Sequence, residues 1–462
     1  MSDQIRTNLL NRTLNHVRNV WQDVSGSAFQ KHLKLSPSLP DDEIPQLKDW
    51  INSCLNHPGG EVTARQHTAQ LGSNYLDMDT DGRLRFLQLL SRDYDVDNNI
   101  IEAAIEQWRE ASPEQRPAAR IALRDSLDPP RQRLLTQFTE LPDGVKFLVD
   151  MRAELLQQLR QQPELATLEA DLKRVLVNWF DIGLLRLEQI TWQSSAQILE
   201  KLIAYEAVHA IQSWDDLKNR LESDRRCFAF FHPNMPDEPL IFVEVALVQG
   251  LADNVQTLLD EQAPVLDLSQ ADTAIFYSIS NAQKGLAGIS FGNFLIKQVV
   301  RKLQQDFPGL KQFSTLSPIP GFTRWLSRQD DEQLAAMPGG ADWIQIRQPQ
   351  WASEWTFGWQ QQETIERSYR EPLLQLAAHY LAVEKRRGQT ALDPVSHFHL
   401  SNGAEVARIN WLADCSDNGL KQSAGMMVNY LYNLDKITQR VQDYSAEGDV
   451  AMSSAVKALL KV

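Results

Sequence analysis

The sequence lacks a cysteine framework. Its 462 residues include three cysteines, Cys54, Cys227 and Cys415, which lie far apart and form no CxxC pair. Zinc sites, redox motifs and disulfide-rich domains need closely spaced or numerous cysteines. We therefore expect buried small hydrophobic side chains or incidental thiols at these positions, and no metal site.

Long apolar runs and an excess of positive charge are also missing. No stretch approaches the roughly 20 apolar residues that a membrane helix needs, and the first residues lack the pattern of a secretion signal. The sequence therefore predicts a cytoplasmic protein with no membrane partner. A formal net charge of -14 argues against nucleic-acid binding, so any site for an anionic ligand must be local.

The two halves of the chain differ in pattern. Up to about residue 181, apolar residues recur with helical spacing and convincing strands are absent, whereas strands and helices alternate beyond about residue 190. The fold class predicted is α+β. We expect an all-helical bundle over residues 1–188, suited to helix packing or a subunit interface, and a mixed-sheet domain with helical insertions over residues 189–462.

One motif in the helical half resembles the start of a calcium loop. Asp77–Gly82 alternates carboxylates before a glycine, but the position of the closing glutamate holds Gln88. A solvated acidic turn is therefore expected there, without a metal.

The second half begins with two capped helix starts, Thr191–Glu200 and Ser213–Leu217, followed by a predicted sheet. Residues 226–232 and 240–247 are expected to form an antiparallel hairpin. Residues 273–280 and 311–316 read as strands joined by a helix, which predicts a parallel pair with a right-handed crossover. The carboxyl ends of this pair share one edge of the sheet, where ligands of open α/β sheets bind.

A glycine-bearing loop, Gln283–Gly292, lies at that edge before the helix that begins at Asn293. Glycines let backbone N–H groups approach an anion, and the helix start adds partial positive charge. The pattern Gln-x-Gly-x-x-Gly is neither a Walker loop nor a dinucleotide fingerprint, but is close to the pyrophosphate loop of acyl-CoA N-acetyltransferases. From this pattern alone, a purely structural glycine turn is an equal alternative.

The second predicted strand leads into Ser317, which faces the same crevice as the loop. Ser317 lacks the G-x-S-x-G elbow of hydrolases, and a turn serine before proline is the alternative interpretation. His397 and His399 lie in the turn-rich segment Asp393–Ala404. If that segment is extended, both rings point to the same side, and the spacing does not choose between them.

Further elements are expected towards the carboxyl end. The tryptophans of residues 343–359 are interpreted as core or interface anchors. The patterns predict an amphipathic helix over residues 365–387, a strand over 405–411, a helix start over 423–433 and a last helix to Val462.

These residues together resemble the malonyl-CoA decarboxylase family, most densely from residue 191 to Tyr432. The segments that carry the resemblance are Phe276–Ser280, Gly288 with Gly292–Val299, Leu316–Phe322, Phe398–Leu400 with Asn402–Ala404, and Arg408–Trp411 with Ala413–Asp414.

The resemblance implies a fold and an activity. It implies a helical domain that builds a homo-oligomer, a dimer or tetramer, and a catalytic domain with an acetyltransferase-like (GNAT) fold. It also implies cofactor-independent conversion of malonyl-CoA to acetyl-CoA and carbon dioxide. A thioester can itself accept the electron pair, so no pyridoxal, thiamine or metal motif is needed. The rival interpretations are an acyl-CoA N-acetyltransferase and a non-catalytic malonyl-CoA sensor.

The resemblance also implies site residues. The catalytic residues expected are Ser317 in Ser-Pro-Ile-Pro-Gly-Phe, His399 in Phe-His-Leu, and Tyr432. Some family members carry glutamate where this chain has Ser290, so an acidic helper is not expected there. Basic candidates for the phosphates or for structure are Lys284, Arg324 and Arg408. The CoA-binding residues expected are Gln283, Gly285, Ala287, Gly288, Ile289, Ser290, Phe291, Gly292 and Asn293.

Overall fold

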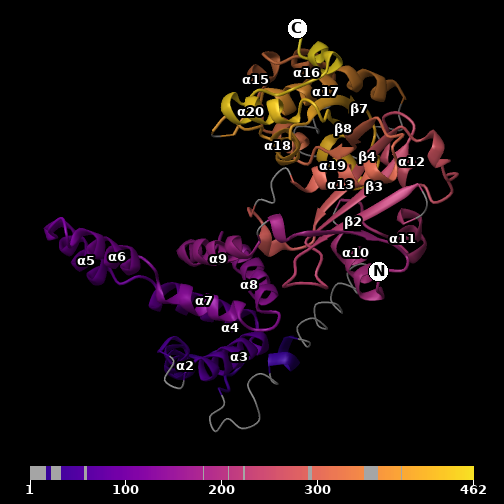
Figure 1. Ribbon diagram of the computed structural model, residues 1–462. Coiled ribbons are helices and arrows are strands. Elements are labelled where there is room, and N and C mark those ends of the chain that lie inside the picture. The colour runs from indigo at the N-terminus through magenta and orange to yellow at the C-terminus, as the bar shows by residue number, and fades with distance from the viewer. Residues whose placement is uncertain are drawn as a thin grey trace.

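The computed structural model describes residues 17–21, 33–56, 60–180, 182–206, 208–221, 224–289, 294–347, 363–386 and 388–461. Figure 1 shows a helical N-terminal part beside a larger part built around a sheet. No helix within these ranges is long and apolar enough to cross a membrane. The architecture is α+β, as predicted.

In the described part of the chain before Phe180, the assigned elements are all helices, as the apolar spacing predicts. The acidic turn is the start of one of them, because Asp79 caps the next helix by accepting a hydrogen bond from the Gly82 N–H at 2.9 Å. The elements are η1 (Asp41–Glu43), α2 (Ile44–Asn56), α3 (Glu61–Asp77), α4 (Thr80–Asp93), α5 (Asn98–Glu110), α6 (Arg116–Ser126), α7 (Pro130–Thr139), α8 (Gly144–Gln158), η2 (Pro163–Leu165) and α9 (Ala166–Trp179).

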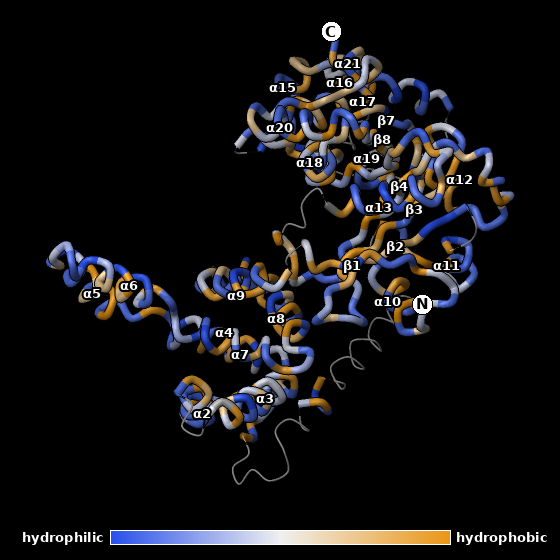
Figure 2. The backbone as a smooth tube through the Cα atoms, viewed as in Figure 1, coloured by the Kyte–Doolittle hydropathy of each residue, from blue (hydrophilic) through white to orange (hydrophobic). Residues whose placement is uncertain are grey.

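The α5–α6 hairpin projects from the helical part (Figure 1). Figure 2 shows hydrophobic and hydrophilic residues alternating along both helices. The exposed apolar side chains of the α5–α6 hairpin include Ile100, Trp108 and Ile121.

The described strands form one mixed, eight-stranded sheet in the order β1-β2-β3-β4-β5-β8-β6, with β7 paired to β8. The antiparallel hairpin of β2 and β3 and the parallel pair of β4 and β5 are confirmed. The edge strand β1 was not predicted. The strands are β1 (Arg186–Ile190), β2 (Arg225–Phe231), β3 (Ile241–Val248), β4 (Thr273–Asn281), β5 (Gln312–Thr315), β6 (Ser317–Pro318), β7 (Glu405–Asn410) and β8 (Met427–Tyr432).

Helices cover both faces of this sheet. Ala274 and Phe276 of β4 share a core with the crossover helix, whereas Ile275 and Tyr277 pack with Val255 on the other face. The helices are η3 (Ile182–Leu184), α10 (Ala196–Tyr205), α11 (Trp214–Arg220), α12 (Val255–Leu259), η4 (Leu268–Gln270), η5 (Lys284–Leu286), α13 (Phe294–Asp306), α14 (Phe322–Leu326), α15 (Asp331–Ala335), α16 (Gly340–Ile346), α17 (Glu363–Ala382), α18 (Pro394–Ser401), α19 (Asp417–Ser423), α20 (Ile437–Glu447) and α21 (Ser454–Leu459).

Two predictions near the carboxyl end are wrong. The expected helix start at residues 423–433 is instead strand β8, because Ala424 and Gly425 adopt positive φ and end α19. The expected continuous last helix is two helices, since α20 ends at Gly448 with a φ of 69° and α21 starts again after its cap at Ser453.

Neighbouring strands of the sheet separate beyond the carboxyl end of β5. The β4–β5 pairing stops at Phe276 and Thr315, after which Ser317 pairs with Val428 of β8 instead. The later residues of β4 continue beside β3 alone. Ser317 therefore lies where two neighbouring strands separate.

Candidate active site

The three predicted catalytic residues form one chain of hydrogen bonds. The Ser317 Oγ lies 3.1 Å from Nε2 of His399, and the His399 Nδ1 lies 2.8 Å from the Tyr432 hydroxyl. Ser317 is 7% exposed, and His399 and Tyr432 are each 3% exposed. The structure therefore brings together residues that are far apart in the sequence.

Three elements position these side chains. Ser317 begins the short strand β6, and Tyr432 ends β8. His399 lies on α18, which starts at an Asp-Pro pair because Asp393 accepts hydrogen bonds from the N–H groups of Val395 and Ser396. The cap stabilises the start of the helix that carries the imidazole.

The segment that contains the two histidines is helical, so the extended conformation considered for it is wrong. Two residues along a helix turn a side chain by about 200°, and the two rings have different partners. His397 Nδ1 lies 2.9 Å from the Tyr444 hydroxyl, whereas His399 reaches Ser317. The helix thus separates two residues that the spacing alone left equivalent.

The His399 ring is neutral in this environment. Burial lowers its pKa to about 3, and the ring stacks on Tyr430 with centroids 4.5 Å apart. The Ser317 hydroxyl donates to Thr315 Oγ1 at 2.9 Å, so its oxygen accepts the bond from His399. Nε2 therefore carries the ring proton, and Nδ1 accepts from Tyr432.

A buried amide supports the strand that presents Ser317. Asn429 Nδ2 donates to the Thr315 carbonyl at 2.7 Å, and its Oδ1 accepts from Arg408 Nε at 3.0 Å. Arg408 also donates to the Leu251 and Ala252 carbonyls. Arg408 is therefore a structural residue. Thr315 and Asn429 were missed, although Thr315 lies two residues before Ser317, which puts both on one side of an extended chain.

Part of the glycine loop faces protein. The Gln283 side chain is buried and its Nε2 donates to the Pro239 carbonyl at 2.9 Å. A Cβ on Gly285 would lie 1.8 Å from the Val149 carbonyl oxygen of α8, so this glycine allows close packing of the helical part. These two positions therefore have structural roles.

The remaining loop residues differ in exposure. Ala287 and Gly288 are exposed and Ile289 is buried. Among the basic candidates, Lys284 and Arg324 are exposed. Four expected CoA-binding residues lie outside the described residues: Ser290, Phe291, Gly292 and Asn293.

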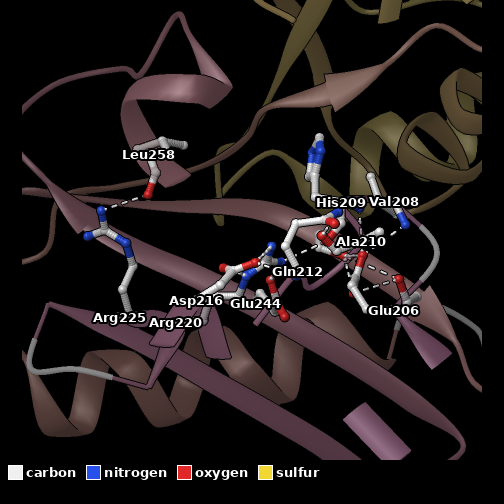
Figure 3. A network of polar contacts seen from close by, with 12 residues as sticks. Glu206, Val208, His209, Ala210, Gln212, Asp216, Arg220, Arg225, Glu244 and Leu258 are labelled. Carbon is white, nitrogen blue, oxygen red and sulfur yellow. Dashed lines mark hydrogen bonds and ion pairs between the residues drawn. The ribbon is translucent and has the colours of Figure 1, made fainter. Parts of the chain in front are cut away.

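A second buried polar network lies where the α10–α11 connection packs on β4 and β3 (Figure 3). The Glu206 carboxylate accepts from the His209 N–H at 2.9 Å and from the hydroxyls of Ser278 and Ser280. These two serines of the Phe276–Ser280 segment thus anchor the connection to the strand.

The same network contains a buried arginine. Arg220 pairs with Asp216 at 2.7 Å and with Glu244 at 3.1 Å. Burial raises the pKa of Glu244 to about 7 despite Arg220.

The described residues contain no cluster of three or more metal-ligating side chains. Cys54 and Cys227 are buried and Cys415 is exposed, all with free thiols.

The fold and these contacts define an α+β protein with a buried serine–histidine–tyrosine site at the point where two neighbouring strands of its sheet separate. Comparisons with known proteins identify the family. The sequence profile of the malonyl-CoA decarboxylase C-terminal domain matches residues 183–462, and that of the malonyl-CoA decarboxylase N-terminal domain matches residues 94–180. The chain belongs to the malonyl-CoA decarboxylase family.

Named relatives and solved structures agree. The chain is 36% identical over 402 residues to mitochondrial malonyl-CoA decarboxylase of Anser anser anser, covering 81% of this chain and 79% of that protein. The mouse protein of the same name is 37% identical over 361 residues, 73% of this chain and 72% of that protein.

Crystal structures of malonyl-CoA decarboxylase from two bacteria are similar to this chain over most of its length. The Rhodopseudomonas palustris structure has 40% identity and a TM-score of 0.82, covering 90% of this chain and 99% of that chain. The Agrobacterium vitis structure has 38% identity and a TM-score of 0.80, covering 90% and 100%.

Proposed function

We propose that this chain is a carboxy-lyase that converts malonyl-CoA to acetyl-CoA and carbon dioxide. The observation that carries the proposal is the hydrogen-bonded chain of Ser317, His399 and Tyr432 at the sheet edge from which the glycine loop also emerges. The names of the relatives give the substrate class.

The reaction breaks the bond between the carboxylate carbon and the methylene carbon of the malonyl group. The electron pair of that bond moves into the thioester, which forms an enolate as carbon dioxide leaves. A site for this reaction needs donors aimed at the thioester oxygen and an acid that protonates carbon. The thioester accepts the electrons itself, so the proposed reaction is cofactor-independent.

The site residues fit these two roles. Ser317, with backbone N–H groups, holds the thioester or carboxylate oxygen through its hydroxyl. His399 delivers the Nε2 proton to the methylene carbon, and the enolate carbon is basic enough to take a proton from a neutral imidazole. Tyr432, whose hydroxyl already lies 2.8 Å away, then relays a proton to Nδ1, and solvent supplies the one proton that the overall reaction consumes. The ring thus ends the step as the other neutral tautomer rather than as an anion.

A cationic clamp on the departing carboxylate would slow the reaction, because tight pairing would stabilise the ground state. Arg408 does not provide one, since Asn429 and two backbone carbonyls occupy its guanidinium.

An assay with malonyl-CoA as the sole substrate tests the proposal. The purified chain should release carbon dioxide and acetyl-CoA in equal amounts, and Ser317→Ala should lower kcat by roughly 10²-fold or more while circular dichroism stays unchanged. An N-acetyltransferase would release no carbon dioxide without an amine acceptor. A sensor would bind malonyl-CoA without turnover, and either result would overturn the proposal.

The division of labour between the two parts of the chain is also proposed. Residues 1–188 form a helical domain that helps build a homo-oligomer, and residues 189–462 form the catalytic domain. Light scattering coupled to gel filtration tests for a dimer or tetramer. A cytoplasmic location remains a prediction, and the goose and mouse relatives are named as mitochondrial proteins.

A further inference from the structure

The helical part of the chain reaches the glycine loop directly. Arg152 of α8 donates from Nη2 to the Ala287 carbonyl at 2.8 Å and from Nη1 to the Gly285 carbonyl. Its side chain is 2% exposed and pairs with Glu169 of α9 at 2.6 Å. The loop that follows β4 is therefore held from outside its own domain.

These bonds direct the loop carbonyls towards the helices. The neighbouring Gly288 has a φ of 72° and is exposed. Within the described ranges, its backbone N–H has no hydrogen-bond acceptor. The carbonyls of Gly285 and Ala287 already accept hydrogen bonds from Arg152, so the exposed N–H beside them leaves a locally positive surface.

A cation lies beside Gly288. A Cβ built on Gly288 would lie 3.4 Å from Nζ of Lys173, on the same helix α9 that supplies Glu169. Lys173 is half-buried, and it forms no ion pair with any residue that the structure describes. Charged side chains that are partly desolvated are usually paired, so an unpaired ammonium here is available for an external anion.

The negative net charge of the chain makes a local site for an anion significant. A protein of formal net charge -14 offers no general attraction to an anionic ligand. A lysine ammonium beside an exposed glycine whose N–H is unbonded provides the local attraction that a phosphate needs.

We infer that Lys173 binds a phosphate group of the CoA substrate, so the helical domain completes the nucleotide end of the catalytic site. This inference rests on the proposed function, and it gives the helical domain a role in substrate binding besides assembly. Lys173 is a binding residue in it, and Arg152 is a positioning residue that fixes the loop carbonyls.

Steady-state kinetics with two substrates test the inference. Malonyl-CoA carries the nucleotide phosphates, and malonyl-pantetheine carries the same thioester without any phosphate. Lys173→Met should raise the KM for malonyl-CoA roughly 10-fold, the loss expected for one charge-assisted hydrogen bond. Its kcat for malonyl-CoA and its kcat/KM for malonyl-pantetheine should match those of the unaltered protein.

The matched control is Arg174→Met, which removes an exposed cation from the next position of α9. It should leave all of these constants unchanged. An unchanged KM for malonyl-CoA in Lys173→Met would overturn the inference. An equal loss with malonyl-pantetheine would also overturn it, because the effect would then be structural.

Calorimetric titration with CoA separates this inference from the proposed function, because it needs no turnover. The Kd for CoA should rise roughly 10-fold in Lys173→Met and stay constant in Arg174→Met. If the unaltered protein binds CoA in this way but releases no carbon dioxide from malonyl-CoA, the proposed reaction fails while the phosphate site stands. Equal Kd values in Lys173→Met and the unaltered protein would refute the site even if decarboxylation occurs.

Discussion

His397 and His399 are two positions apart on α18, yet each is hydrogen-bonded to a different tyrosine. His397 lies 2.9 Å from the Tyr444 hydroxyl, and His399 lies 2.8 Å from the Tyr432 hydroxyl. Of these two histidines, His399 is the one bonded to Ser317. The pair therefore provides a matched comparison within one helix.

His399→Asn should lower kcat by roughly 10²-fold or more, because it removes the group proposed to protonate the enolate carbon. His397→Asn should leave kcat within about twofold, since His397 contacts Tyr444 and Ser401 rather than Ser317. Carbon dioxide release from malonyl-CoA measures both. Similar losses in the two variants would show that the effect comes from disturbing α18 rather than from lost proton transfer.

Tyr432→Phe removes the hydroxyl that bonds His399 Nδ1 and keeps the ring. We expect kcat to fall about 10-fold with little change in KM, because the hydroxyl proposed to relay a proton to the imidazole is lost. Tyr444→Phe removes the hydroxyl that bonds His397 and accepts from the Ala391 N–H, and it should leave kcat unaltered. A solvent deuterium isotope effect on kcat that grows in Tyr432→Phe would identify a slowed proton transfer, and an unchanged kcat would remove Tyr432 from the mechanism.

Burial of His399 should make folding stability depend on pH. Its pKa falls from 6.5 to about 3 in the folded protein, so below pH 6.5 the unfolded chain takes up a proton that the folded chain excludes. This stabilising contribution is complete above pH 6.5 and is lost as pH falls from 6.5 towards 3.

Between pH 7 and pH 5, the protein should lose about 2 kcal/mol more free energy of unfolding than His399→Asn does. Urea unfolding followed by circular dichroism at both pH values measures this difference. The same shift predicts that kcat has no step near pH 6.5 due to His399. Equal pH dependence in the two proteins would show that His399 is accessible to protons in the folded state.

The parallel unit of the sheet could be predicted because its signals are local. A β-branched strand, a glycine loop, an amphipathic helix and a second strand follow one another from Thr273 to Thr315, and each pattern is complete within its own segment. Strand β8 could not be predicted in this way. Its methionine, leucine and tyrosine residues are compatible with a helix, and pairing with β5, β6 and β7 selects the strand.

The candidate site, too, could be predicted only in part. Ser317 and the loop could be placed at one sheet edge from the chain order of the parallel unit. The choice of His399 depends on a helix whose orientation is fixed by packing on the sheet, and the spacing of two histidines does not contain that information. The Arg152 contact with Gly285 joins two domains, so no pattern within either segment indicates it.

That contact leads to a prediction about both stability and binding. Arg152→Met should destabilise the protein by about 1–3 kcal/mol, because it leaves the Gly285 carbonyl without its donor and the half-buried Glu169 carboxylate without its partner. It should also raise the KM for malonyl-CoA, since the carbonyls of Gly285 and Ala287 lose the donor that holds them. Thermal unfolding and steady-state kinetics measure the two effects.

The double variant Arg152→Met with Glu169→Gln separates the two effects. Removing the unpaired charge should recover part of the stability, whereas the raised KM should remain because the loop still lacks its donor. Lys302→Met, which breaks the exposed pair with Asp306 on α13, is the control and should change stability by less than about 1 kcal/mol. If the double variant regains a normal KM, the loop is held by its own conformation, and the helical domain does not position it.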